Sequence, residues 1–190
     1  MDDLFAPAPI TVFDDAEGGM RYWPDVVDPD TATRWFEALR DHAHWQHERR
    51  PMYDRIVDVP RLRAGYRLDE LPAQLPLAEM LSLVQGRVPA PYTGVGMNFY
   101  RDGRDSVAMH HDKLHTLQPG QPIALLSLGG TRRMHIRARE GRRRTWALDL
   151  APGSLLVMSH ASQMTHEHGI PKTRQAVAPR MSVVFRARPE

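Results

Sequence analysis

The pattern of apolar and polar residues changes near residue 93. Beyond it the chain consists of short runs separated by Gly, Pro or charged turns: VGMNFY, SVAMHHD, IALLSL, RRMHIRA, TWALDL, SLLVMS and MSVVFRA. Many short apolar runs with turn signals between them are typical of a protein built from antiparallel strands. Residues 93–188 therefore predict a double-sheet β roll.

Helical periodicity is confined to the part of the chain before these runs. Apolar residues recur at helical spacing over 30–47, where Asp30 or Thr31 can cap the helix. A second short helix is expected over 76–86, ending at Gly86. Both helices would back a sheet. The predicted fold class is therefore mostly β with flanking helices (α+β).

The length of the chain suits a single domain over residues 1–190, because one core can still grow continuously at this size. Residues 1–25 are rich in Pro, Asp and Gly and are expected to form an extended N-terminal arm. The sequence contains no cysteine, which excludes disulfides, thiolate nucleophiles and zinc sites built on sulfur. With no basic leader and no apolar run long enough to span a bilayer, we expect a cytoplasmic monomer without a membrane anchor.

The charge of the protein adds one indication. The formal net charge is +2 and the isoelectric point is about 9.2, with arginine far more frequent than lysine. This balance favours a polyanionic partner. Solvated surface charge in an arginine-rich proteome explains the same composition, so charge alone does not choose between the two.

His110 and Asp112 stand two residues apart in the run SVAMHHD. Side chains at i and i+2 of a strand point to the same face, so both would enter one cavity while His111 faces the other way. Such a pair often occurs by chance, and a distal histidine is needed beside it. His168, in THEHGIPK, precedes a turn with Gly and Pro that could return it to the pair. Two histidines and one carboxylate leave three positions of an iron ion open, as in non-haem Fe(II) oxygenases.

The C-terminal run PRMSVVFRA places Arg180, Ser182 and Arg186 at even separations, hence on one face of a strand. Two inward arginines are costly to bury unless an anion meets them, and a dicarboxylate co-substrate would do so. Asn98 and Tyr100 are likewise two residues apart. Their amide and phenol could complete the hydrogen bonding of that dicarboxylate.

The order of these motifs along the chain resembles that of the AlkB family of nucleic-acid dealkylases. The shared pattern is Asn-x-Tyr, His-x-Asp, a His before a Pro-containing turn, and Arg-x-x-x-x-x-Arg, over about residues 45–188, with NFYRDGRDSVAMHHD as the most similar stretch. The resemblance implies a double-stranded β-helix, or jelly-roll, core and O2-dependent chemistry. It also implies Fe(II) on His110, Asp112 and His168, and 2-oxoglutarate held by Asn98, Tyr100, Arg180, Ser182 and Arg186.

Two positions depart from the family pattern. Family members that repair methylated bases often carry an acidic residue two places after the metal-binding Asp, and this chain has Leu114 there. Ser182 stands where several members have Asn. A serine hydroxyl can still hydrogen-bond a carboxylate, with a shorter reach.

Residues 45–66 resemble the nucleotide-recognition lid that precedes the catalytic core in this family. Met52 and Tyr53 are flanked there by five arginines, and basic residues interleaved with an aromatic suit a phosphate backbone with a base stacked beside it. Substrate contacts are expected from Met52, Tyr53 and Arg61, while a structural hairpin covering the sheet is the alternative. In the turn RAREGRRR, Arg142 and Arg143 would contact substrate, or else belong to a solvated hairpin.

The activity implied by the resemblance is oxidative demethylation of N-alkylated bases in DNA or RNA, with release of formaldehyde, succinate and CO2. The partner would be a single-stranded nucleic acid or a base flipped out of a duplex. Leu114 favours an alternative substrate, either modified RNA or a protein side chain. A non-catalytic, cupin-like binding roll is a third reading, against which two inward arginines argue.

Overall fold

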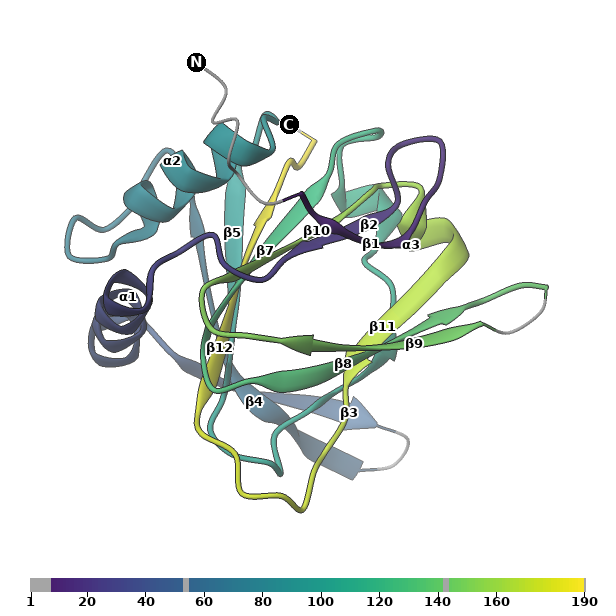
Figure 1. Ribbon diagram of the computed structural model, residues 1–190. Helices are drawn as coiled ribbons and strands as arrows, with labels where there is room; N and C mark the ends of the chain where they lie inside the picture. Colours follow the sequence, from purple (N-terminus) through teal and green to yellow (C-terminus); the bar gives the residue numbers. More distant parts are fainter. Residues whose placement is uncertain (1–7, 53–54, 142–143, 190) are drawn as a thin grey trace.

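Two antiparallel sheets form the framework of the protein, and its computed structural model describes residues 8–52, 55–141 and 144–189 (Figure 1). The larger sheet has eight strands in the order β1-β2-β10-β7-β12-β5-β4-β3, and the smaller has four in the order β6-β11-β8-β9. Their bounds are β1 (Ile10–Phe13), β2 (Met20–Trp23), β3 (Gln46–Met52), β4 (Arg55–Arg67), β5 (Gly94–Tyr100), β6 (Val107–His110), β7 (Ile123–Gly129), β8 (Arg132–Ala138), β9 (Thr145–Leu150), β10 (Ser154–Met158), β11 (His166–Ile170) and β12 (Arg180–Arg186). The predicted class, mostly β with a jelly-roll core, is confirmed.

Helix α1 (Pro29–His42) begins directly after its capping residue, which is Asp28 and not the predicted Asp30 or Thr31. The carboxylate of Asp28 accepts a hydrogen bond of 2.9 Å from the N–H of Thr31. The predicted helix end at residue 47 is wrong, because the chain from Gln46 onward pairs with β4 as strand β3. Pairing with the next strand in a hairpin thus overrides the helical periodicity that the sequence suggests beyond His42.

Helix α2 (Leu77–Arg87) agrees with the prediction to within one residue at each end, and Gly86 lies inside its last turn. Two shorter helices occur near the functional residues, a 3-10 turn η1 (Leu114–Thr116) and α3 (Ser162–Thr165). Helices α1 and α2 lie on one side of the larger sheet, and the smaller sheet lies on the other (Figure 1). All described helices are too short or too polar to cross a membrane.

Each face of the larger sheet has its own apolar core. Val183 and Phe185 of β12 pack toward the helices, in the cluster that contains Trp35 of α1. The intervening Val184 packs toward the smaller sheet, together with Ile136 of β8. We call the side that faces the smaller sheet the inner face, because the functional residues described below lie on it.

The predicted N-terminal arm and the predicted lid both contribute strands to the larger sheet. Within the region predicted to be an extended arm, β1 and β2 pair as a hairpin and β2 also pairs with β10. Within residues 45–66, β3 and β4 form a second hairpin that continues the sheet beyond β5. The segment does form a hairpin, but it extends the edge of the sheet and does not cover it, and its contact with a nucleotide stays a prediction.

Candidate metal and cofactor site

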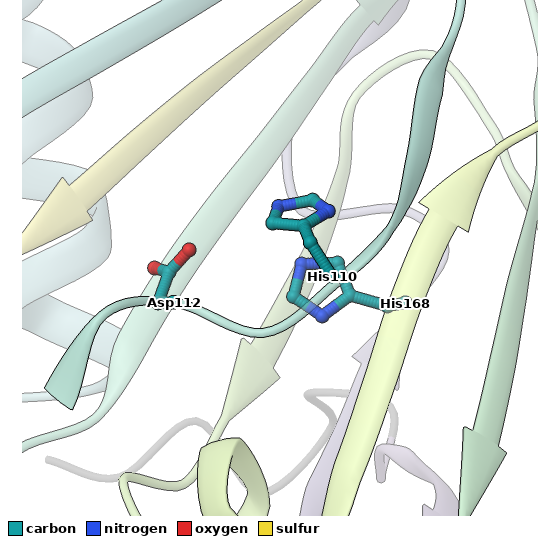
Figure 2. A group of neighbouring side chains, drawn as sticks. All are labelled: His110, Asp112 and His168. Carbon is teal, nitrogen blue, oxygen red and sulfur yellow. The ribbon is translucent and has the colours of Figure 1, made fainter. Parts of the chain in front are cut away.

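The two predicted histidine ligands are direct neighbours across two strands. His110 is the last residue of β6, and His168 of β11 is its register partner. Their imidazole centroids lie 4.6 Å apart. Asp112 follows on the loop after β6, and one potential ligand atom from each residue lies within 4.8 Å of the others. Figure 2 shows the three side chains gathered around one point. The structure therefore assembles the predicted His, Asp and His set.

Asp112 reaches this point by a route that strand alternation does not explain. Strand β6 ends at His110, so Asp112 lies outside the strand. Two contacts orient it instead: its N–H donates to Oε1 of Gln163 at 2.9 Å, and its Oδ2 accepts from Nε of Arg186 at 2.7 Å. His111 is absent from the ligand group found among the described residues, and its Nδ1 lies 3.0 Å from the carbonyl oxygen of Asp112.

The protonation states of these groups suit metal binding. Burial raises the pKa of Asp112, but the charge and hydrogen bond of Arg186, with the two histidines, outweigh it and hold this pKa below its usual range. Burial lowers the pKa of His168, and charge on His110 lowers it further. At neutral pH the carboxylate is thus ionised and His168 is neutral, which are the states that bind a metal. Nδ1 of His110 lies 2.9 Å from the carbonyl oxygen of Ala108, which leaves its Nε2 for the metal.

The residues predicted to hold 2-oxoglutarate line one cavity beside the histidines. Strands β5 and β12 pair so that Asn98 faces Ser182 and Tyr100 faces Arg180. The amide nitrogen of Asn98 lies 3.3 Å from Oγ of Ser182. The predicted residues in this cavity are Asn98, Tyr100, His110, His168, Arg180, Ser182 and Arg186. The roles of these residues in binding stay predictions, but the fold does bring their side chains together in one cavity.

Arg180 carries the clearest sign of a missing anion. Its side chain is 1% exposed, yet within the described residues both terminal nitrogens, Nη1 and Nη2, are buried without a hydrogen-bond partner. Its Nε donates to Oγ of Ser127 at 2.9 Å. Burial lowers the pKa of Arg180 to about 10, so the guanidinium stays charged at neutral pH. A planar fork with two free N–H groups fits a carboxylate, and the site therefore fits one end of a dicarboxylate.

Arg61, which the sequence analysis predicted to contact the substrate, lies in this cavity. Its Nε donates to Oδ1 of Asn98 at 2.8 Å and its Nη1 to the carbonyl oxygen of Ser106 at 3.2 Å. The first bond fixes the orientation of the Asn98 amide, whose nitrogen then faces Ser182. Arg61 is therefore part of the wall of this cavity.

Two further residues support the site and were missed by the sequence analysis. Gln163 is 1% exposed and accepts the N–H of Asp112, while Ser127 is fully buried and holds Nε of Arg180. A signal existed for Ser127, because it is a lone polar residue within the apolar run IALLSL. For Gln163 there was none, since its partner lies 51 residues away along the chain.

Tyr53, Arg142 and Arg143 lie outside the described residues, and so does the side chain of Met52. Leu114, at the position where an acidic residue was expected, begins the 3-10 turn η1 and is half-buried.

Comparison with known proteins agrees with this geometry. The family model described as the 2OG-Fe(II) oxygenase superfamily matches residues 19–188, nearly the whole chain. The chain belongs to this superfamily. Fe(II) and 2-oxoglutarate, which give the oxygenase family its name, fit the His, Asp and His group and the unsatisfied guanidinium of Arg180.

Individual relatives place this oxygenase near the AlkB proteins, which confirms the resemblance seen in the sequence. It is 34% identical over 110 residues to the human DNA oxidative demethylase ALKBH2, covering 54% of this chain and 42% of that protein. It is 29% identical over 183 residues to the mouse alpha-ketoglutarate-dependent dioxygenase alkB homolog 3, covering 86% of this chain and 64% of that protein. The oxygenase thus spans less than two thirds of the length of either relative.

A solved structure shares the fold of the oxygenase. The structure of OsALKBH1 superimposes with a TM-score of 0.64 over 94% of this chain and 99% of that chain, at 14% sequence identity. At this identity the likeness concerns the fold alone.

Proposed function

We propose that this protein is a 2-oxoglutarate-dependent dioxygenase that oxidatively removes alkyl groups from base nitrogens in DNA or RNA. The observation that carries the oxygenase assignment is the buried Arg180 fork, which opens into the same cavity as His110 and His168. A buried cation with two unsatisfied donors is costly unless an anion completes it. A metal-binding group and a carboxylate receptor in one cavity match the needs of a co-substrate that must contact both.

Each residue has a separate task in this proposal. His110, Asp112 and His168 would hold the iron, while Arg180 would bind the distal carboxylate of 2-oxoglutarate. Arg186 keeps the Asp112 carboxylate ionised and oriented through its bond of 2.7 Å. When bound, Fe(II) and 2-oxoglutarate together activate O2 and supply the oxidising power that hydroxylates an N-alkyl carbon. The hydroxylated methyl group then leaves as formaldehyde, and 2-oxoglutarate becomes succinate and CO2.

The nucleic-acid part of the proposal rests on the relatives and on the β3-β4 hairpin. One relative is named a DNA oxidative demethylase. On the hairpin, Ile56 is 71% exposed, and the exposed Arg49 and Arg63 form ion pairs with Asp58 and Glu48. Exposed ion pairs contribute little stability, so a phosphate can replace either carboxylate at small cost. An exposed apolar side chain on a hairpin that also carries exposed arginines suits contact with a base and its backbone.

The proposal is tested by turnover of methylated oligonucleotides. Purified protein with Fe(II), ascorbate and 2-oxoglutarate is given single-stranded DNA or RNA carrying 1-methyladenine or 3-methylcytosine, and succinate and formaldehyde are measured. We expect formaldehyde in equal amounts to the demethylated base, and none from the unmethylated strand. Succinate release that no oligonucleotide changes would contradict the nucleic-acid part. Failure to bind 2-oxoglutarate at all would instead favour the non-catalytic binding roll.

A protein side chain is the second candidate substrate, and Leu114 is the observation that favours it. Lys113 and Leu114 follow the metal-binding Asp112, so the first two residues after it offer no carboxylate to hydrogen-bond a base. If oligonucleotides are not turned over, succinate release with methylated peptides is the assay that decides for this candidate.

A further inference from the structure

The turn that joins β1 to β2 lies beside helix α3 (Figure 1). We call residues 14–19 the N-terminal turn. Asp15 fixes its backbone, because Oδ1 of Asp15 accepts the N–H groups of Glu17 and Gly19, each at 2.8 Å. Gly19 has a φ of +66°, and a Cβ there would overlap the carbonyl oxygen of Phe13. The turn is therefore rigid, and the second oxygen of Asp15 is held ready for a contact outside it.

That contact is made with Ser159, the residue after β10. The Ser159 hydroxyl donates to Oδ2 of Asp15 at 2.6 Å, and the Ser159 N–H donates to the carbonyl oxygen of Gly19 at 2.8 Å. Burial raises the pKa of Asp15, but hydrogen bonds from Ser159, Glu17 and Gly19 outweigh it and hold this pKa below its usual range. At neutral pH Asp15 is thus a carboxylate, which only accepts hydrogen bonds.

From Ser159 the hydrogen bonds continue through two buried side chains to a metal-binding residue. Oγ of Ser159 accepts the N–H of Ser162 at 2.9 Å. Oγ of Ser162 accepts Nε2 of Gln163 at 3.0 Å, and Oε1 of Gln163 accepts the N–H of Asp112 at 2.9 Å. Ser159 is 3% exposed, and Ser162 and Gln163 are each 1% exposed. We call Asp15, Ser159, Ser162 and Gln163 the Asp15 network.

Each bond in the Asp15 network has only one possible direction. The hydrogen of the Ser159 hydroxyl points at Asp15, so its lone pairs face the N–H of Ser162. The Ser162 hydroxyl donates to the carbonyl oxygen of Ser159 at 2.6 Å, so it can only accept from Gln163. The Gln163 amide must therefore turn its oxygen toward Asp112. A reversed amide would bring two buried donors together there, which is costly.

The N-terminal hairpin also contacts the segment that carries His168 at two further points. Oε2 of Glu17 accepts the N–H of Ala161, the residue before α3, at 2.7 Å. The ring of Phe13 stacks on the imidazole of His166, with centroids 3.8 Å apart and planes at 9°. His166 is two residues before His168 in β11 and hence on the same face. The hairpin therefore supports the segment from α3 to β11.

We propose that Asp15 and Ser159 are positioning residues for the metal centre, which hold Gln163 and, through it, the loop that carries Asp112. Groups that fix the geometry of a ligand are needed for tight metal binding even when they do not touch the metal. The inference concerns the metal centre alone and does not depend on which substrate the oxygenase acts on.

Two variants interrupt the Asp15 network at its outer end. Ser159→Ala removes the hydroxyl, and Asp15→Asn keeps the size of the side chain and one acceptor oxygen for the turn but faces Ser159 with a donor. The control for the first is Ser154→Ala, because Ser154 is also buried and its hydroxyl also bonds a carbonyl oxygen. The control for the second is Asp14→Asn, which makes the same change of charge at an exposed neighbour.

Hydrogen exchange of the Asp112 amide in the metal-free protein is the first readout. It should be at least about tenfold faster in Ser159→Ala and Asp15→Asn than in their controls, because a buried hydrogen bond is lost. Exchange at Val183, a buried residue of the central strand β12, reports global opening and serves as the reference. The anaerobic Kd for Fe(II) should rise about threefold to tenfold, since both residues act on the ligand indirectly.

Coupling to Gln163 separates positioning from a general loss of stability. If Asp15 acts through Gln163, Asp15→Asn should accelerate exchange at Asp112 in the parent and add little in a Gln163→Met background. Equal acceleration in both backgrounds would show the inference to be wrong. So would exchange rates and Fe(II) Kd values that match those of the controls. If Ser159→Ala does not fold, Asp15→Asn and Asp14→Asn decide the question.

Discussion

Oε1 of Gln163 lies 2.9 Å from the backbone nitrogen of Asp112 and accepts its N–H. Gln163 belongs to α3, the short helix directly before strand β11, which carries His168. The amide of Gln163 is held in turn, since its Nε2 donates to Oγ of Ser162 at 3.0 Å. One buried side chain therefore connects the segment that carries His168 to the loop that carries Asp112.

Replacing Gln163 should weaken iron binding even though Gln163 is not a ligand. Gln163→Met keeps the side-chain length but removes the acceptor, so the Asp112 loop loses its anchor. We expect about a tenfold loss of Fe(II) affinity, the lower end of the range for residues that orient ligands. The measurement is anaerobic Fe(II) titration, with hydrogen exchange of the Asp112 amide as a metal-free readout.

The matched control for this change is Gln85→Met. Gln85 in helix α2 also bonds backbone groups, those of Ala90, and α2 lies across the larger sheet from strand β11 (Figure 1). It should lose stability without losing iron affinity. Gln163→Glu retains an acceptor oxygen and should restore part of the affinity. Equal iron affinity in the parent and Gln163→Met would remove the positioning role.

Arg180→Lys should impair 2-oxoglutarate binding although the positive charge is kept. The ammonium group lacks the planar fork that the two free Nη atoms present. Loss of one charge-assisted hydrogen bond corresponds to about a tenfold to hundredfold higher Kd. The control is Arg133→Lys, because Arg133 makes a two-bond contact with Asp149 on the surface. An unchanged anaerobic 2-oxoglutarate titration for Arg180→Lys would exclude the assigned contact.

His110→Ala and His168→Ala should each abolish turnover and reduce bound iron, because each removes one of three ligands. His111→Ala should retain iron, since His111 is not in the ligand group. Iron content after anaerobic reconstitution is the measurement, read beside circular dichroism to confirm folding. Stoichiometric iron in a His110→Ala, His168→Ala double variant would overturn the assignment.

The stability of the metal-free protein should fall in mild acid because of His168. Burial lowers its pKa in the folded state below the usual 6.5. The unfolded chain therefore takes up a proton first as the pH falls, and this favours unfolding. Between about pH 7 and about pH 5.5 the free energy of unfolding should drop by about 1 kcal/mol from this residue. Urea denaturation at the two pH values measures the drop, and His168→Gln should be less sensitive; equal sensitivity would contradict the cause.

Local rules accounted for much of the fold and part of the site. Short alternating runs predicted the strands, since side-chain direction in a strand depends only on the parity of the residue number. The same rule placed Arg180, Ser182 and Arg186 on one face of β12, and Asn98 and Tyr100 on one face of β5. It grouped Asp112 with His110, as the structure does, but for an incorrect reason, because β6 ends before Asp112.

The sequence by itself determined which chemical groups are present and which neighbours in a strand share a face, because both follow from the residues and from backbone geometry. Tertiary structure alone decided that β3 replaces the end of the predicted helix, that Arg61 holds Asn98, and that Gln163 anchors Asp112. It also decided that Asp15 holds Ser159. Apart from the β3-β4 hairpin, these contacts join segments far apart in the chain, and their register is set by the packing of whole sheets, which no local pattern contains.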